Sequence, residues 1–180
     1  MSLTIQEDSL FCNDSSCVLD ISLTFTNASK ENVLVYALDG GLRLAPFDLS
    51  ELCDKRSTGT SILIGLYYPN GKQARPTIEI AHPHGQRKVT REVLDSVLYQ
   101  ARVDFLKSGI VLKSGESETY IKEFSLKRFM LHKGLYYLKA AYYSGDKTLE
   151  ILDVDKIKKS KAKLFQGCTF SQNIPLTITR

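Results

Sequence analysis

Apolar and polar residues alternate most clearly along residues 18–26, where Leu19, Ile21, Leu23 and Phe25 are separated by single polar side chains. Successive side chains of a β-strand point to opposite faces of the sheet. An alternation of period two is therefore typical of a strand that is buried on one face only. The run predicts a half-buried strand whose four apolar side chains face a core.

Further runs predict the rest of an antiparallel structure. A polar turn at 27–32 leads into a return strand, and Asn70-Gly71 is a strong hairpin signal between two later runs. The predicted strands after the first are residues 33–38, 61–68, 77–81, 110–112, 119–126, 135–143 and 173–178. In the long run 135–143, the set Tyr136, Leu138, Ala140 and Tyr142 is preferred as the buried face, because the complementary set contains Lys139.

Residues 90–102 follow a different period. Apolar residues recur there at helical spacing, at Val93, Leu94, Val97, Leu98 and Ala101. Thr90 is a residue type that caps helix starts. The segment therefore predicts a short helix, which we expect to lie across one edge or end of the strands.

These elements predict one all-β domain over residues 1–180, an antiparallel immunoglobulin-like β-sandwich with a short helical insertion. The inserted segment spans about residues 53–106. A chain of 180 residues suits a single domain with its own core. A net charge of +4, from 24 basic and 20 acidic residues, is far below that of a dedicated nucleic-acid-binding protein, so we expect no nucleic-acid partner. No apolar run is long enough to predict a transmembrane segment.

Four cysteines occur, at Cys12, Cys17, Cys53 and Cys168. The turn-forming residues between Cys12 and Cys17 can bring these two thiols together, which leaves Cys53 and Cys168 as a second pair by elimination. Four reduced cysteines are the alternative. The first residues do not resemble a secretion signal, so the chain is either cytosolic or has lost a leader. A secreted or periplasmic location is favoured over a cytoplasmic one.

Several short segments occur in an order that resembles a known family. The segments are residues 23–29, 33–42, 111–117, 124–126, 134–140, 165–167 and 171–174. Together they are similar to the immunoglobulin-like N-terminal domain of deuterolysin-type, lysine-specific zinc endopeptidases and to related free-standing bacterial domains. The resemblance covers most of the chain outside about residues 50–105.

The chain departs from that family in ways that bear on its activity. It has no catalytic domain and no His-Glu-x-x-His sequence, and Phe165 replaces the tryptophan usual near the last strand. The resemblance therefore implies an accessory or protein-interaction domain without catalytic activity or cofactor, and the partner would be a protein, either a protease or another protein that the domain accompanies. The sequence determines no oligomeric state.

Candidate chemistry is sparse. His82 and His84 could approach one metal ion, with His132 as a third ligand in a metal-assisted hydrolase, but no spacing marks that ligand set, and an exposed polar loop is the preferred interpretation. No nucleophile elbow or phosphate-binding loop occurs. We therefore expect neither an enzyme nor a bound metal.

Two other residue groups could form a partner surface. The first is a lysine-rich segment, with Lys156, Lys158, Lys159, Lys161 and Lys163, which would suit an anionic partner or form a solvated connector. The second consists of adjacent tyrosines, of which one per pair should be exposed and could bind carbohydrate or protein. These pairs are Tyr67 with Tyr68, Tyr136 with Tyr137, and Tyr142 with Tyr143.

Overall fold

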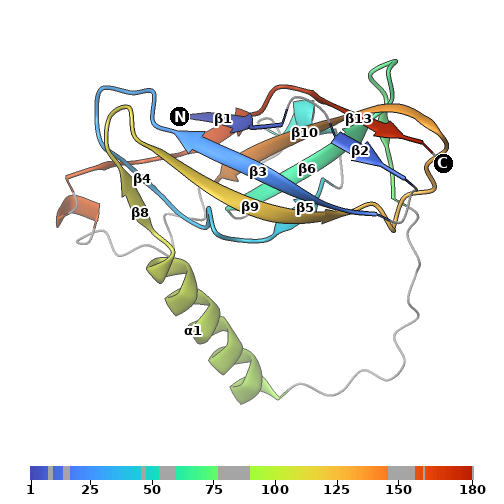
Figure 1. Cartoon of the computed structure of the whole chain (residues 1–180). Helices are drawn as coiled ribbons and strands as arrows, with labels where there is room; N and C mark the ends of the chain where they lie inside the picture. The colour runs from blue at the N-terminus through green and yellow to red at the C-terminus, as the bar shows by residue number, and fades with distance from the viewer. Residues whose placement is uncertain are drawn as a thin grey trace.

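The computed structural model describes residues 1–7, 10–13, 17–45, 48–52, 60–76, 90–145, 157–159 and 161–179. Strands dominate this part of the chain (Figure 1). The elements in chain order are β1 (Ser2–Ile5), β2 (Leu10–Cys12), β3 (Val18–Thr26), β4 (Val33–Val35), β5 (Leu42–Leu44), a 3-10 helix (Leu49–Glu51), β6 (Ser61–Tyr67), β7 (Gln73–Ala74), α1 (Arg91–Lys107), β8 (Ile110–Leu112), β9 (Ser117–Ser125), β10 (Gly134–Ser144), β11 (Lys163–Leu164), β12 (Gly167–Phe170) and β13 (Ile174–Ile178).

The described strands form three sheets. The first sheet has the order β1-β3-β9, the second β2-β13-β10-β6-β5 with β7 and β12 as side branches, and the third β11-β4-β8. The long strands pair antiparallel, with β3 against β9 and β10 against β6 and β13. Three pairs are parallel, and each involves a strand of two or three residues: β2 with β13, β4 with β11, and β5 with β6. The main sheets are therefore antiparallel, as predicted.

The core lies between the first and second sheets. The four predicted inward residues of β3, Leu19, Ile21, Leu23 and Phe25, are buried. From the second sheet, the predicted set on β10 is buried against them, and it consists of Tyr136, Leu138, Ala140 and Tyr142. Two sheets that bury alternate side chains against each other form a sandwich. The all-β sandwich is thus confirmed, and its immunoglobulin-like topology stays a prediction.

The strand after β3 does not return beside it. β4 belongs to the third sheet, where it pairs with β8 and β11. The cause lies in the turn, because Asn27 is fully buried. Its side-chain amide donates to the carbonyl oxygens of Glu31 (2.8 Å) and Leu112 (2.9 Å), while its carbonyl accepts from the Ser29 amide (3.0 Å). These bonds attach the turn to the end of β8 and direct β4 out of the first sheet.

The middle of the chain also differs from expectation. The Asn70-Gly71 turn joins β6 to the short β7, in place of the predicted partner 77–81, which lies outside the described residues. β6 falls within the segment predicted as inserted, yet it pairs with both β10 and β5 in the second sheet. Thirteen strands are described where the sequence predicted eight, because many of the strands are only two to four residues long.

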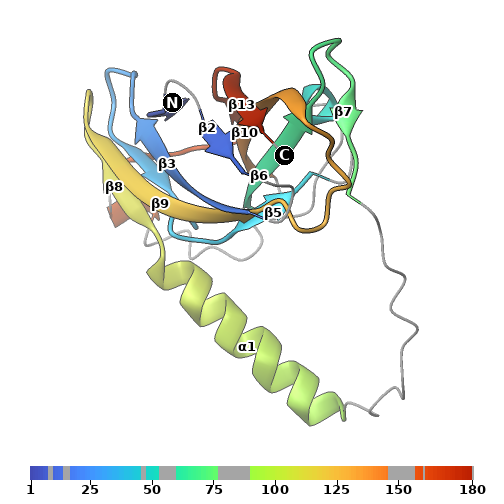
Figure 2. The same cartoon turned by 45° about the vertical axis from the view of Figure 1, so that its right-hand side comes forward.

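Helix α1 confirms the predicted helix and its Thr90 cap, and it continues five residues beyond the predicted end at residue 102. The predicted position of the helix across the sandwich is wrong. None of its seventeen residues is buried, and Figures 1 and 2 show it extending away from all the strands. This projection makes α1 the first candidate for function.

Candidate functional site

Helix α1 has well-formed ends. At its start, the Thr90 hydroxyl accepts the Val93 amide hydrogen bond (3.5 Å), which satisfies one of the amides that have no partner within the helix. Lys107 lies in the last turn, where a cation interacts favourably with the helix dipole. The Gln100 side chain also donates to the Asp104 carboxylate four residues later (2.8 Å). Local sequence thus supports the helix where it has no packing partner.

The C-terminal end of α1 is attached to the third sheet through aromatic packing. Phe105 stacks on Tyr36, with ring centroids 4.9 Å apart and planes inclined by 15°. Leu106 packs into the same small cluster, which also contains Leu34. Stacked aromatic rings contribute about 0.5–1.5 kcal/mol beyond the area that they bury. Among the described residues, these contacts hold the helix at its C-terminal end.

Hydrogen bonds reinforce this attachment. The Ser108 hydroxyl caps the helix by donating to the Phe105 carbonyl (2.7 Å), and it accepts from the Ala37 amide (3.0 Å). Gly109 follows, and a Cβ atom at that position would collide with the Tyr36 ring. Glycine at 109 lets the chain leave the helix directly against Tyr36, so the junction is tightly packed.

Tyr36 is in turn connected to the sandwich core. The buried Tyr142 hydroxyl donates to the Tyr36 carbonyl (2.9 Å) and accepts from the Tyr36 amide (3.4 Å). Burial raises the pKa of Tyr142 well above its usual range. Since Tyr142 also makes an edge contact with Phe25 (5.7 Å), a continuous path of packed groups runs from the core to the base of α1. The core therefore determines the direction in which the helix points.

The rest of α1 presents an exposed apolar face. Leu94, Val97 and Leu98 lie on one side of the helix, and each remains about half exposed or more, at 49, 59 and 58%. Val93 and Tyr99, beside them, are also exposed. Soluble monomers rarely leave a contiguous apolar patch uncovered without a binding role. We call Leu94, Val97, Leu98 and the neighbouring exposed Ala101 the α1 face.

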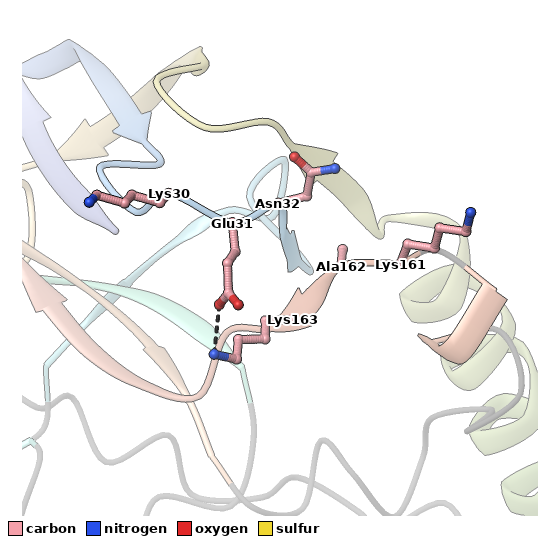
Figure 3. A pocket seen from close by; sticks show the side chains of 6 residues that line it. All are labelled: Lys30, Glu31, Asn32, Lys161, Ala162 and Lys163. Atoms are coloured by element: carbon pink, nitrogen blue, oxygen red, sulfur yellow. Dashed lines mark ion pairs between the residues drawn. The ribbon is translucent and has the colours of Figure 1, made fainter.

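A second candidate surface is a depression of about 520 Å³ beside the third sheet (Figure 3). Its lining residues are Lys30, Glu31, Asn32, Lys161, Ala162 and Lys163. The Glu31 carboxylate pairs with Lys163 (2.6 Å), and both side chains are well exposed to solvent. Figure 3 shows Lys30 and Lys161 pointing in different directions. Because the ammonium groups do not converge and one is already paired, the depression is a weaker candidate than the α1 face.

The other predicted lysines that have described positions do not line this depression. Lys158 and Lys159 are exposed, and Lys156 lies outside the described residues. Ile157 and Ala162 from the same segment pack in the cluster that holds Phe105. The lysine-rich segment therefore has an apolar side that supports the base of α1, in addition to its charged side.

The predicted Cys12–Cys17 disulfide is present. Cys168 is also disulfide-bonded, and Cys53 lies outside the described residues. The first bridge connects the end of β2 to the start of β3, at the end of the sandwich distant from α1 (Figure 1). Cys12, Cys17 and Cys168 therefore belong to the scaffold and not to the α1 face.

The tyrosine pairs do not follow the predicted division into one buried and one exposed member. Tyr142 and Tyr143 are both buried, because Leu49 and Leu52 cover the outer face of the second sheet at that point. In the first pair, the Tyr67 hydroxyl is half-buried. It donates to the Asp48 carboxylate (3.4 Å) and accepts from the Leu49 amide (3.2 Å), and burial raises the pKa of Tyr67 to about 12. Three of these tyrosines thus hold the scaffold together.

The remaining tyrosines form no flat exposed platform. Tyr136 is buried and exchanges hydrogen bonds with the backbone of His132, while Tyr137 is partly buried. Tyr68 is 37% exposed and packs against Tyr136 with centroids 5.5 Å apart. The premise of an exposed tyrosine from each pair therefore holds in part only.

The predicted metal candidates His82 and His84 lie outside the described residues, whereas His132 is an exposed loop residue. Among the residues with described positions, no three histidine, cysteine or acidic side chains gather closely enough to hold a metal ion. In the same part of the chain, no helix has both the length and the apolar character that crossing a bilayer requires.

Sequence reasoning did not find the anchor residues Tyr36, Phe105 and Ser108. A signal for Phe105 was present, since the spacing of Leu94, Leu98 and Ala101 continues to it. Only the fold brings Tyr36 beneath that position. Comparison with known proteins adds no further assignment: the chain matches no protein-family model, no curated protein and no solved structure.

Proposed function

We propose that this protein is a non-catalytic interaction domain that binds another protein chain through the α1 face. The observation that carries the proposal is the helix itself, which has seventeen residues, none of them buried, and a row of apolar side chains open to solvent. An amphipathic helix whose apolar face fits a groove or another helix is a recurrent mode of protein recognition.

The energetics favour such a role. Fully burying an aliphatic side chain contributes about 1.5–3 kcal/mol, so covering the half-exposed Leu94, Val97 and Leu98 contributes about 1 kcal/mol each. The anchor formed by Phe105, Tyr36 and Ser108 holds the helix in a defined direction before any partner arrives. Preorganisation lowers the entropic cost of binding. The sandwich thus acts as a rigid support for one presented helix.

The resemblance to the immunoglobulin-like domains of zinc endopeptidases agrees with this role, because those domains accompany a catalytic unit. On this proposal the sandwich supplies position and stability, and α1 supplies contact. A protease is one class of partner that the resemblance suggests.

Site-specific photocrosslinking tests the proposal. A photoreactive phenylalanine analogue replaces Val97 on the α1 face, and in a matched variant it replaces the exposed Ser96 on the other side of the helix. After irradiation in an extract of the source cells, we expect discrete crosslinked products from position 97 that are absent from position 96. Identical products from both positions, or none from either, would refute a binding role for this face.

A further inference from the structure

The α1 face has the pattern of a helix that pairs with another helix. Leu94, Leu98, Ala101 and Phe105 follow one another at intervals of four, three and four residues. That spacing keeps apolar side chains on a single seam, as in coiled coils. Phe105 is engaged by Tyr36, so the open part of the seam consists of Leu94, Leu98 and Ala101.

The charges beside this seam indicate what the partner is. Asp95 and Arg102 are seven residues apart, which places them on the same flank of the helix, and both are exposed. In an antiparallel pair related by a two-fold axis, the same flanks of both helices meet, and each contact occurs twice. Asp95 would then lie opposite the partner's Arg102, and Arg102 opposite the partner's Asp95.

We infer that the partner of the α1 face is a second copy of this chain, bound through an antiparallel pair of α1 helices. This inference rests on the proposed function and names the occupant of the same surface. A parallel pair has no such complementarity, because the opposite flank near the seam carries Val97 and Asp104. Of the two orientations, only the antiparallel one brings Asp95 and Arg102 of different chains together.

The apolar residues support the same register independently. When Asp95 is level with the partner's Arg102, Ala101 is level with the gap between the partner's Leu94 and Leu98. Side chains of paired helices interdigitate in this way, each entering a space between residues of the facing helix. The two-fold axis then passes beside Leu98, close to the helix midpoint at Tyr99, so the open parts of the two seams lie against each other.

The position of α1 on the sandwich allows this pairing. A helix of seventeen residues extends about 25 Å, and within the described part of the chain it packs against the sandwich through its C-terminal end. Figures 1 and 2 show its free length clear of the strands. An antiparallel partner places its own sandwich at the opposite end of the pair, so the two sandwiches stay apart.

Charge exchange tests the inference. Sedimentation equilibrium of the whole chain is measured from about 1 to 500 µM, since one helix pair is smaller than a standard interface and gives a concentration-dependent dimer. Asp95→Arg and Arg102→Asp each replace two attractive pairs with two repulsive ones, and each should raise the dimer dissociation constant about tenfold. The double variant D95R/R102D restores both pairs and should return within about twofold of the wild type.

Glu92→Arg is the matched control, because it makes the same change of charge on the side of α1 opposite the seam. It should leave the dissociation constant unchanged, and circular dichroism should show equal helix content in all variants. A wild-type chain that remains monomeric at every concentration overturns the inference. A double variant as weak as the single ones overturns the antiparallel register.

The two proposals can fail separately. If the chain is monomeric but still crosslinks from position 97 to a different protein, a second copy is ruled out as the partner, while the binding role of the α1 face is retained. A monomeric chain without position-specific crosslinks removes both.

Discussion

Strand β10 and helix α1 are both rich in apolar residues, but their surroundings are opposite. In β10, Leu138 and Ala140 are completely buried, whereas in α1 Leu98 is 58% exposed. β10 pairs with β6, β12 and β13 and faces the first sheet. α1 meets the rest of the described chain only through its last turn. A periodic apolar face shows that burial of that surface is favourable, but it does not identify the segment or molecule that buries it.

The two regions should differ most in how much the free energy of unfolding falls when a leucine in each is truncated to alanine. Leu138→Ala removes a side chain from a closed core and should lower the free energy of unfolding by about 2–5 kcal/mol. Leu98→Ala should change it by no more than about 0.5 kcal/mol, as for most surface positions. Urea unfolding of both variants at low protein concentration, where α1 has no partner, checks the difference. Equal losses would mean that α1 belongs to the cooperative core.

The connection between the two regions can be weakened by a smaller change. Tyr142→Phe keeps the ring but removes the hydroxyl, and with it the two hydrogen bonds to the buried Tyr36 backbone. We expect a loss of about 1–3 kcal/mol in the free energy of unfolding. Tyr99→Phe on the exposed helix surface is the control and should have almost no effect. Equal unfolding midpoints for the two variants would show that the Tyr142 hydroxyl does not stabilise the connection between the core and α1.

The same variant should alter the pH dependence of stability. Burial raises the pKa of Tyr142 above its ordinary value of 10.0, so the unfolded chain releases this proton first as the pH rises. The folded chain binds more protons in that range, and the free energy of unfolding therefore falls above about pH 10. Tyr67, with its pKa raised to about 12, acts in the same direction. Tyr142→Phe should show a shallower fall between pH 10 and 12, and parallel curves would argue against this assignment.

The smallest effect is expected at the depression beside the base of α1. Lys163→Gln removes the ion pair with Glu31, whose two side chains are 75% and 60% exposed. Exposed ion pairs contribute about 0–1 kcal/mol and are screened by salt. We expect thermal unfolding at low and high salt to differ little between this variant and the wild type. A large, salt-dependent decrease in the unfolding temperature would mean that the depression stabilises the fold as much as the helix anchor does.

Local patterns predicted the long elements well. Residues 18–26 form β3 with the predicted bounds, and the inward set of β10 was identified from the position of Lys139 alone. β9 shows where such reasoning weakens. Its inward positions are Tyr120, Lys122 and Phe124, so a lysine faces the core there, with its ammonium 5.1 Å from the centroid of the Tyr120 ring. That contact joins neighbours on the same face of β9, and an alternation rule that places every lysine on the outer face does not foresee it.

The sheet to which a strand belongs depends in two places on the hydrogen bonds of one side chain. Asn27 stands in a stretch that reads as an ordinary polar turn, yet its amide is bonded to a backbone carbonyl 85 residues away. Gln172 similarly pairs with the Ile5 backbone across 167 residues. Such bonds exist only once distant segments are adjacent. Nothing in the local sequence distinguishes these residues from exposed turn residues.

The sequence by itself determined that the chain forms a β-sandwich with one capped helix, because side-chain periodicity and turn chemistry act over a few residues. Tertiary structure alone decided that α1 projects and where it is anchored. The reason is that Phe105 stacks on Tyr36, whose backbone is hydrogen-bonded to the Tyr142 hydroxyl. Leu94 and Leu98, in contrast, stay exposed, because no described segment of the chain covers them. Local pattern sets which face avoids water, and the global packing sets whether the chain itself can cover it.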